Sequence, residues 1–150
     1  MNIGKTTKTK SAFRMEYSVT ISINANPDKI WKLLTDAAGY THWNSTIKSL
    51  EGNITKGNKI KLRAKLDEKR VFTLTVAEIE PMKRMVWKSG AAPMFKGVRT
   101  YTLTPSPDGT TDFTMAEVFT GIMLPMIAGS LPDFSQAFEQ FAADLKRAAE

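Results

Sequence analysis

The side chains best suited to acid–base chemistry are a carboxylate, a guanidinium and a phenol on two adjacent segments: Glu117, Arg99 and Tyr101. If the segment around Glu117 is a strand, alternation places Glu117 on the same face as Met115 and Phe119. If that apolar face lines a cavity, burial raises the pKa of the Glu117 carboxylate and suits it to acid–base catalysis, with Arg99 or Tyr101 as the second polar group. Two other arrangements stay open, and the sequence favours them over a catalytic role. In the first, Arg99 neutralises Glu117 across the strand pair; in the second, Glu117 faces solvent.

His42 is the only histidine, and the sequence has no cysteine. A single histidine argues against a two-histidine metal site, and the lack of cysteine excludes disulfides, zinc ribbons, thiolate catalysis and iron–sulfur clusters. We therefore expect neither a metal nor a cofactor. His42 is a further catalytic candidate, as a proton shuttle at a cavity mouth, because histidine titrates near neutral pH. The alternative, which we favour, is a partly exposed loop residue before Trp43.

Large apolar side chains form a second set, which could line a pocket for an apolar ligand. Methionine is flexible and polarisable, so it suits pockets that accept varied ligands, and the chain has eight methionines. Methionines and tryptophans also fill ordinary cores, and this alternative stays open. The candidate ligand-binding residues are Trp43, Trp87, Tyr101, Met115, Glu117, Phe119, Met126, Phe134 and Phe138.

The elements that position these residues can be predicted from periodicity. Alternation predicts a strand over residues 16–23, and Asn26 and Pro27 predict the start of a short helix that ends at Gly39. Tyr40 and Trp43 then fall in an irregular or single-turn segment. Six extended segments separated by breaker-rich turns follow, over residues 47–52, 59–66, 71–80, 84–89, 97–104 and 111–120.

The last forty residues change character. The apolar residues 122–128 predict a lid or the lead-in to a helix, and a membrane-insertion tip is the weaker alternative. Residues 130–133 resemble a capping box, which predicts the start of a long C-terminal helix. Its buried stripe comprises Leu131, Phe134, Phe138, Phe141, Ala142 and Leu145.

This order of elements predicts an α+β fold. A curved antiparallel sheet of six or seven strands surrounds a long C-terminal helix, and one or two short helices follow the first strand. A single helix does not fill the concave side of a long curved sheet, so we expect a cavity between the helix and the sheet.

The charge is unevenly distributed along the 150 residues. The chain has 21 basic and 15 acidic side chains, and residues 1–14 supply +4 of the net +6. We predict that residues 1–14 form a flexible basic N-terminal arm and that residues 15–150 form one domain. Since residues 15–150 carry only +2, we expect no specific nucleic-acid partner. No apolar run approaches the length of about 20 residues that spans a membrane, so we expect a cytoplasmic protein without integral membrane association.

Four segments in order resemble the SRPBCC or START-like helix-grip superfamily. They are residues 22–36, residues 40–44, residues 77–81 with Trp87 after them, and residues 117–121 before the final helix. The resemblance covers residues 15–150, and the chain is similar to small bacterial polyketide cyclase-like single-domain proteins. In this superfamily the tryptophan that matches Trp43 packs near the pocket entrance.

The resemblance and the layout together predict binding of a small hydrophobic or aromatic ligand in the helix–sheet cavity, by a carrier or a sensor. One alternative is a cyclase, dehydratase or hydrolase that uses Glu117 with Arg99, Tyr101 or His42. Another is an interaction protein that resembles chaperone activators. The expected partner is a small hydrophobic molecule, and the expected assembly is a monomer or a homodimer.

Overall fold

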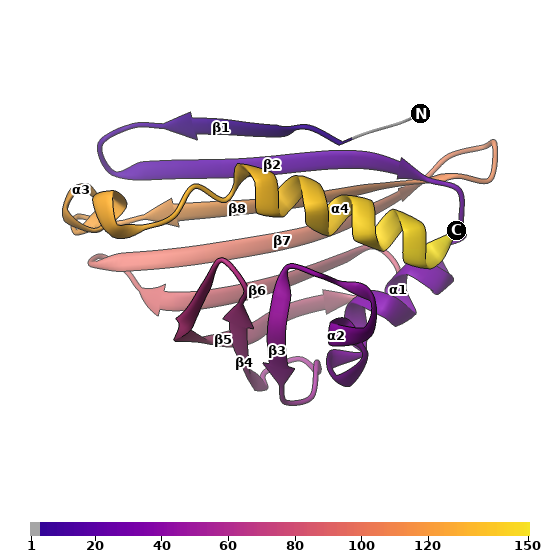
Figure 1. Ribbon diagram of the computed structural model, residues 1–150, viewed down its shortest axis with the longest axis horizontal. Helices are drawn as coiled ribbons and strands as arrows, with labels where there is room; N and C mark the ends of the chain where they lie inside the picture. The colour runs from indigo at the N-terminus through magenta and orange to yellow at the C-terminus, as the bar shows by residue number, and fades with distance from the viewer. Residues whose placement is uncertain (1–3) are drawn as a thin grey trace.

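One antiparallel sheet contains every strand of the computed structural model, which describes residues 4–150 (Figure 1). The strands are β1 (Thr6–Lys10), β2 (Arg14–Ile23), β3 (Ile47–Glu51), β4 (Lys59–Ala64), β5 (Asp67–Glu80), β6 (Arg84–Ala91), β7 (Phe95–Pro105) and β8 (Thr111–Thr120). Their order across the sheet is β1-β2-β8-β7-β6-β5-β4-β3.

The helices lie on one side of this sheet. They are α1 (Pro27–Thr35), α2 (Tyr40–Trp43), α3 (Leu124–Ile127) and α4 (Ser135–Ala149), with short 3-10 turns η1 (Ala37–Gly39) and η2 (Ala128–Ser130). The long helix α4 runs across β2 and β8, and α1 and α2 pack beside its C-terminal half (Figure 1). The α+β fold with a C-terminal helix over an antiparallel sheet is therefore confirmed. None of the helices in residues 4–150 is long and apolar enough to span a membrane.

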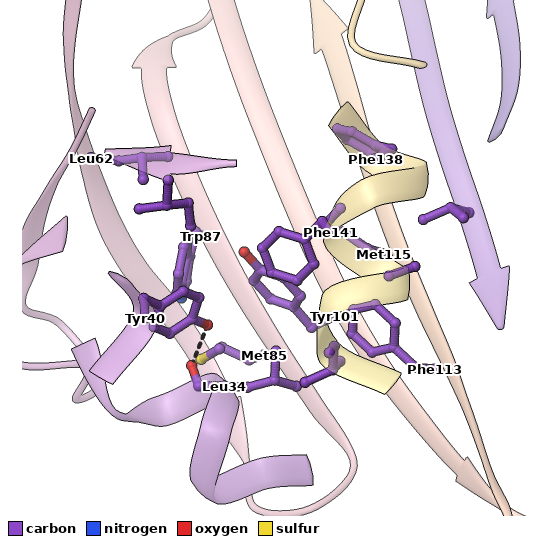
Figure 2. Close-up of a cluster of buried hydrophobic side chains, with 14 of the residues drawn as sticks. Leu34, Tyr40, Leu62, Met85, Trp87, Tyr101, Phe113, Met115, Phe138 and Phe141 are labelled. Atoms are coloured by element: carbon purple, nitrogen blue, oxygen red, sulfur yellow. Dashed lines mark hydrogen bonds between the residues drawn. The ribbon is translucent and has the colours of Figure 1, made fainter. Parts of the chain in front are cut away.

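The core is built of aromatic rings between α4, α2 and the central strands (Figure 2). Phe141 on α4 stacks on Phe113, with 6.2 Å between ring centroids, and Trp87 meets Tyr101 edge-on at 4.9 Å. Tyr40 is fully buried, and its hydroxyl donates to the Leu34 carbonyl at 2.5 Å. These aromatic contacts hold one half of the helix–sheet space closed.

The N-terminal segment differs from the prediction. Thr6–Lys10 form strand β1 and pair with β2, from Thr6 opposite Val19 to Lys10 opposite Met15. The Thr6 N–H also donates to Glu139 Oε2 at 2.9 Å. A flexible arm is therefore wrong for these residues, because non-local pairing with β2 and α4 stabilises a segment whose own composition does not. The sheet has eight strands for this reason, and residues 1–3 of the predicted arm lie outside the described residues.

The start of the C-terminal helix also differs. Helix α4 begins at Ser135, and Ser130 instead donates its hydroxyl hydrogen to the Ile127 carbonyl. The capping box predicted over residues 130–133 is therefore wrong. Asp133 accepts a hydrogen bond from the Ser135 N–H at 2.9 Å, so its carboxylate supplies the capping contact at the actual start.

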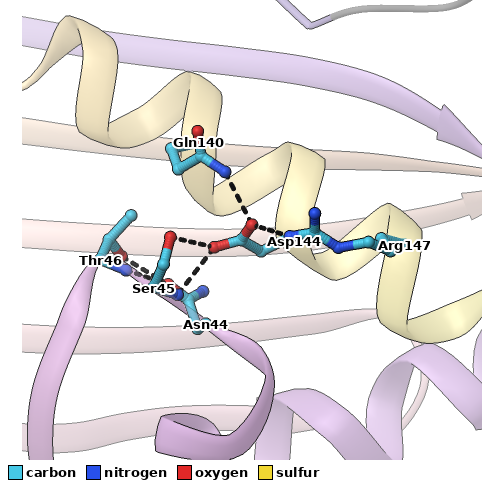
Figure 3. A network of polar contacts seen from close by, with 6 residues as sticks. All are labelled: Asn44, Ser45, Thr46, Gln140, Asp144 and Arg147. Carbon is cyan, nitrogen blue, oxygen red and sulfur yellow. Dashed lines mark hydrogen bonds and ion pairs between the residues drawn. The ribbon is translucent and has the colours of Figure 1, made fainter.

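A buried carboxylate ties α4 to the turn between α2 and β3 (Figure 3). Asp144 is fully buried, and it accepts hydrogen bonds of 2.7 Å each from the Ser45 N–H, the Ser45 hydroxyl and Gln140 Nε2. Arg147, one turn further along the helix, forms an ion pair with the same carboxylate. This network fixes the distance between α4 and the start of β3.

Candidate functional site

A cavity of about 100 Å³ lies between strands β4–β8 and the segment that connects α3 to α4. Its wall is mainly apolar, and its aromatic and aliphatic members are Leu62, Ala64, Phe72, Leu74, Trp87, Phe95, Phe119, Ile127, Leu131 and Phe134. The polar side chains in the wall are Arg70, Ser89, Arg99 and Glu117. Such a lining, apolar with few polar groups, is typical of a site for a small organic molecule.

A second, more open hollow of about 410 Å³ adjoins the cavity, between α4 and strands β3 and β4. The two hollows share Leu62, Ala64, Arg99 and Phe134. The side chain of Phe134 is therefore part of the wall of both hollows. Together they lead from the surface beside α4 to the apolar space over the sheet.

The central polar feature of the cavity is the ion pair of Arg99 and Glu117, and Arg99 also borders the open hollow. The two residues are directly opposite in the β7–β8 pairing, and Arg99 Nε donates to Glu117 Oε1 at 2.6 Å. Both side chains are mostly buried, with 16% and 15% of their surface exposed. Cross-strand neutralisation, one of the arrangements that the sequence left open, is therefore present, and the neutralised carboxylate still lines the cavity.

The guanidinium of Arg99 is held in its charged form. Burial, the largest single influence, acts to lower the pKa of Arg99, but the charge of Glu117, the hydrogen bond to it and the nearby Tyr101 together outweigh burial, so the pKa lies above its usual value. The Arg99 guanidinium carbon also lies 5.2 Å from the centroid of the Phe138 ring, within reach of a cation–π contact. A permanent positive charge, paired with Glu117, thus stands in the mainly apolar wall of the cavity.

Arg99 has hydrogen-bonding capacity to spare. A guanidinium offers five N–H donors, and within residues 4–150 the one hydrogen bond of Arg99 with good geometry is from its Nε–H to Glu117, while the Tyr101 hydroxyl also lies near the guanidinium. The terminal amino groups, Nη1 and Nη2, therefore remain for an acceptor on a bound molecule. Because Arg99 borders both hollows, a ligand in either one can reach it.

Tyr101, the phenol predicted beside this pair, belongs to the core. Its side chain is fully buried, borders neither hollow, and its hydroxyl has no hydrogen-bond partner among the described residues. Burial raises the pKa of Tyr101 to about 12, so the phenol is neutral at physiological pH. Its position favours a packing role against Trp87 and Phe113.

His42 lies apart from the ion pair. It is exposed on the short helix α2 and borders neither hollow. The structure therefore brings together two of the four catalytic candidates, Arg99 and Glu117, and separates His42 and Tyr101 from the cavity wall.

The candidate ligand-binding residues lie in four places: the cavity wall, the wall of the open hollow, the core and the exposed surface. Trp87, Glu117, Phe119 and Phe134 line the cavity, and Met115, Phe134 and Phe138 line the open hollow. Trp43 and Tyr101 pack against Tyr40 and Phe141 in the core. Met126 lies on α3 with 75% of its surface exposed and borders neither hollow.

Sequence reasoning missed one wall of the cavity. Arg70, Phe72 and Leu74 line it from β5, and Phe95 lines it from the start of β7. The alternation of Arg70, Phe72 and Leu74 along one strand face was visible in the sequence. The sequence pattern does not show the curvature of the sheet, which turns this face of β5 toward the α3–α4 connection.

One comparison with known proteins shows the family. The family model described as "Polyketide cyclase / dehydrase and lipid transport" matches residues 14–150. The chain has no significant sequence match among curated proteins.

Solved structures share the fold at low sequence identity. A protein from Mesorhizobium loti is 22% identical with a TM-score of 0.65, and the alignment covers 87% of this chain and 95% of that one. A START superfamily protein from Mycobacterium smegmatis is 18% identical with a TM-score of 0.66, and 89% and 96% of the chains are covered. DynU16, from the dynemicin biosynthetic locus, is 20% identical with a TM-score of 0.63, over 87% of this chain and 45% of DynU16.

Proposed function

The chain belongs to the polyketide cyclase/dehydrase and lipid transport family, and from this we propose that it binds a small hydrophobic or aromatic ligand between the sheet and α4, as a carrier or a sensor. The observation that carries the proposal is the wall of the cavity. Aromatic and aliphatic side chains supply most of it, and its charged groups are the buried ion pair of Arg99 with Glu117 and the more exposed Arg70.

The volumes indicate how such a ligand is accommodated. Pockets for drug-sized molecules measure roughly 300–1,000 Å³. The cavity of about 100 Å³ is below this range, whereas the adjoining hollow of about 410 Å³ is within it. We therefore infer that the ligand occupies both, with its apolar part in the cavity and the ring of Phe134 displaced.

The unused N–H donors of Arg99 indicate which polar group the ligand carries. A carboxylate, phenolate or carbonyl oxygen that meets Nη1 or Nη2 would make a charge-assisted hydrogen bond with a guanidinium that is only 16% exposed. We therefore propose a ligand with one acceptor group on an apolar or aromatic body.

Binding can be tested with a hydrophobic fluorescent dye and a series of displacing aromatic and fatty acids. Ala64 borders both hollows, so Ala64→Phe should fill the shared wall and weaken dye binding at least about tenfold, as expected for loss of a buried apolar contact. Ala143→Phe, at an exposed position of α4, is the matched control and should bind like the wild type. Absence of dye uptake by the wild-type protein at micromolar concentration would overturn the proposal.

A cyclase- or dehydratase-like activity in the same space is a second candidate, favoured by the presence of Glu117 in the cavity wall beside a cation. In that case Glu117 exchanges the proton and Arg99 stabilises a developing oxyanion. Glu117→Gln should then abolish turnover of a bound polyketide while ligand binding persists. Unchanged turnover in this variant would exclude the assignment.

A further inference from the structure

Four of the large apolar side chains that the fold leaves exposed gather at one end of the sheet. We call them the apolar tip: Phe13, Met94, Ile122 and Met126, with 57%, 50%, 57% and 75% of their surface exposed. They come from three segments far apart in the sequence, which are the β1–β2 turn, the β6–β7 turn and the chain from β8 into α3. Exposed apolar clusters of this kind mark interaction surfaces.

The three segments are joined by backbone hydrogen bonds. The bonds are Gly121 N–H to the Phe13 carbonyl at 3.2 Å, Ile122 N–H to the Pro93 carbonyl at 3.0 Å and Met123 N–H to the Met94 carbonyl at 2.9 Å. Gly121 has a φ of +139°, and a Cβ there would lie 2.2 Å from the Met94 carbonyl oxygen. Only glycine allows so close an approach, so the tip is a defined surface.

The strand register places these turns at the same end of the sheet. Arg14 and Lys96 both lie opposite Thr120, and Lys10 lies opposite Met15. Figure 1 shows α3, the β1–β2 turn and the start of β7 together at the left end of the molecule.

The three segments that form the tip carry basic side chains only. Residues 10–14, 90–96 and 121–130 contain Lys10, Arg14 and Lys96 and no acidic side chain. Arg14 pairs with Glu16 at 2.8 Å, whereas Lys10 and Lys96 have no ion pair within residues 4–150. The tip is therefore an apolar centre with two free cations beside it.

We propose that the apolar tip docks the protein on the surface of an anionic lipid bilayer, with its four apolar side chains in the interfacial layer and Lys10 and Lys96 at the headgroups. Apolar insertion combined with basic residues is the chemistry by which peripheral proteins bind such surfaces. A second copy of the chain is the less favourable occupant, because two tips in contact would bring the same cations together.

The tip is also continuous with the cavity. Phe95 and Ile127 line the cavity, and their chain neighbours Met94 and Met126 belong to the tip. Docking would therefore place the cavity wall formed by Phe95 and Ile127 next to the bilayer surface. This consequence rests on the proposed function, whereas the docking itself depends only on the surface.

Vesicle flotation tests the docking. We expect wild-type protein to float with vesicles of phosphatidylcholine and phosphatidylglycerol at 3:1 and to bind pure phosphatidylcholine vesicles more weakly. Ile122→Asp with Met126→Asp should weaken binding at least about tenfold, since two apolar anchors are lost. Lys10→Gln and Lys96→Gln should each weaken it about fivefold on the anionic vesicles only.

Met82→Asp is the matched control. Met82 is 43% exposed and lies in the β5–β6 turn at the other end of the sheet, so this variant should bind vesicles like the wild type. Circular dichroism and the melting temperature verify that each variant is folded.

Three results would overturn the proposal: wild-type protein that does not float, a double aspartate variant that floats like the wild type, or equal loss in the Met82→Asp control. A wild-type dimer that the double aspartate variant converts to a monomer, without vesicle binding, would assign the tip to self-association instead. Ala64→Phe separates this proposal from the cavity, because it should lose dye binding and keep vesicle binding.

Discussion

Replacing Glu117 alone should destabilise the protein more than replacing Glu117 and Arg99 together. In Glu117→Leu, the guanidinium of Arg99 stays 84% buried and its Nε loses an acceptor at 2.6 Å. Breaking a buried ion pair from one side costs about 3–5 kcal/mol, and the residual exposure of Arg99 lowers our expectation to about 2–4 kcal/mol. In the double variant with Arg99→Met, both charges are gone, and we expect stability within about 1 kcal/mol of the wild type.

Urea unfolding of the wild type, both single variants and the double variant gives the coupling energy, with tryptophan fluorescence as the signal. The matched control is the pair of Arg84 and Glu78, which bridges neighbouring strands at 3.0 Å but is 39% and 50% exposed. Its coupling energy should be about 0–1 kcal/mol. A cost below about 1 kcal/mol for Glu117→Leu, or a coupling no larger than in the control, would refute the description of Arg99 and Glu117 as a buried unit.

Two further predictions concern buried polar groups that border neither hollow. Asp144→Ala should lower the free energy of unfolding by about 2–4 kcal/mol, because the donors of Ser45 and Gln140 lose a buried acceptor; a cost below about 1 kcal/mol in urea unfolding would contradict this. Tyr101→Phe should change stability at pH 7 by less than about 1 kcal/mol, because the hydroxyl has no partner among the described residues. The folded pKa of about 12 exceeds the unfolded value of about 10, so Tyr101 makes wild-type stability fall as pH rises from about 10 to 12. Urea unfolding across this range should show a smaller fall in Tyr101→Phe, with Tyr40 still contributing, and equal falls would contradict the assignment.

Most of the fold could be predicted because its signals are local. The strand predicted over residues 111–120 is β8, and the helix start predicted at Pro27 is the start of α1. Alternation and a proline at the first helical position carry this information within a few residues. Strand β1 could not be predicted in this way, because its threonines and lysines become a strand only through pairing with β2 and contacts with α4.

The candidate site was less predictable, because it depends on the curvature of the sheet and the placement of one helix. Alternation placed Arg99 and Tyr101 on one face of β7, yet Arg99 borders the hollows and Tyr101 is covered by the core. The difference arises from Phe141, whose ring lies 6.1 Å from that of Tyr101 and closes the space one helical turn beyond Phe138. No spacing in the sequence specifies how much of the concave face of the sheet α4 covers.

Strand β1 stabilises the start of α4, where Phe134 borders the site. Thr6 donates its hydroxyl hydrogen to the Ser135 carbonyl at 2.7 Å, and Lys8 lies 3.4 Å from Asp133, so β1 supports the first turn of the helix. Phe134, which borders both the cavity and the open hollow, lies between these two supported residues. At the other end of α4 the buried Asp144 holds the helix to Ser45. Because both ends are fixed, movement of the Phe134 side chain, rather than movement of the whole helix, is the lower-cost way to admit a ligand.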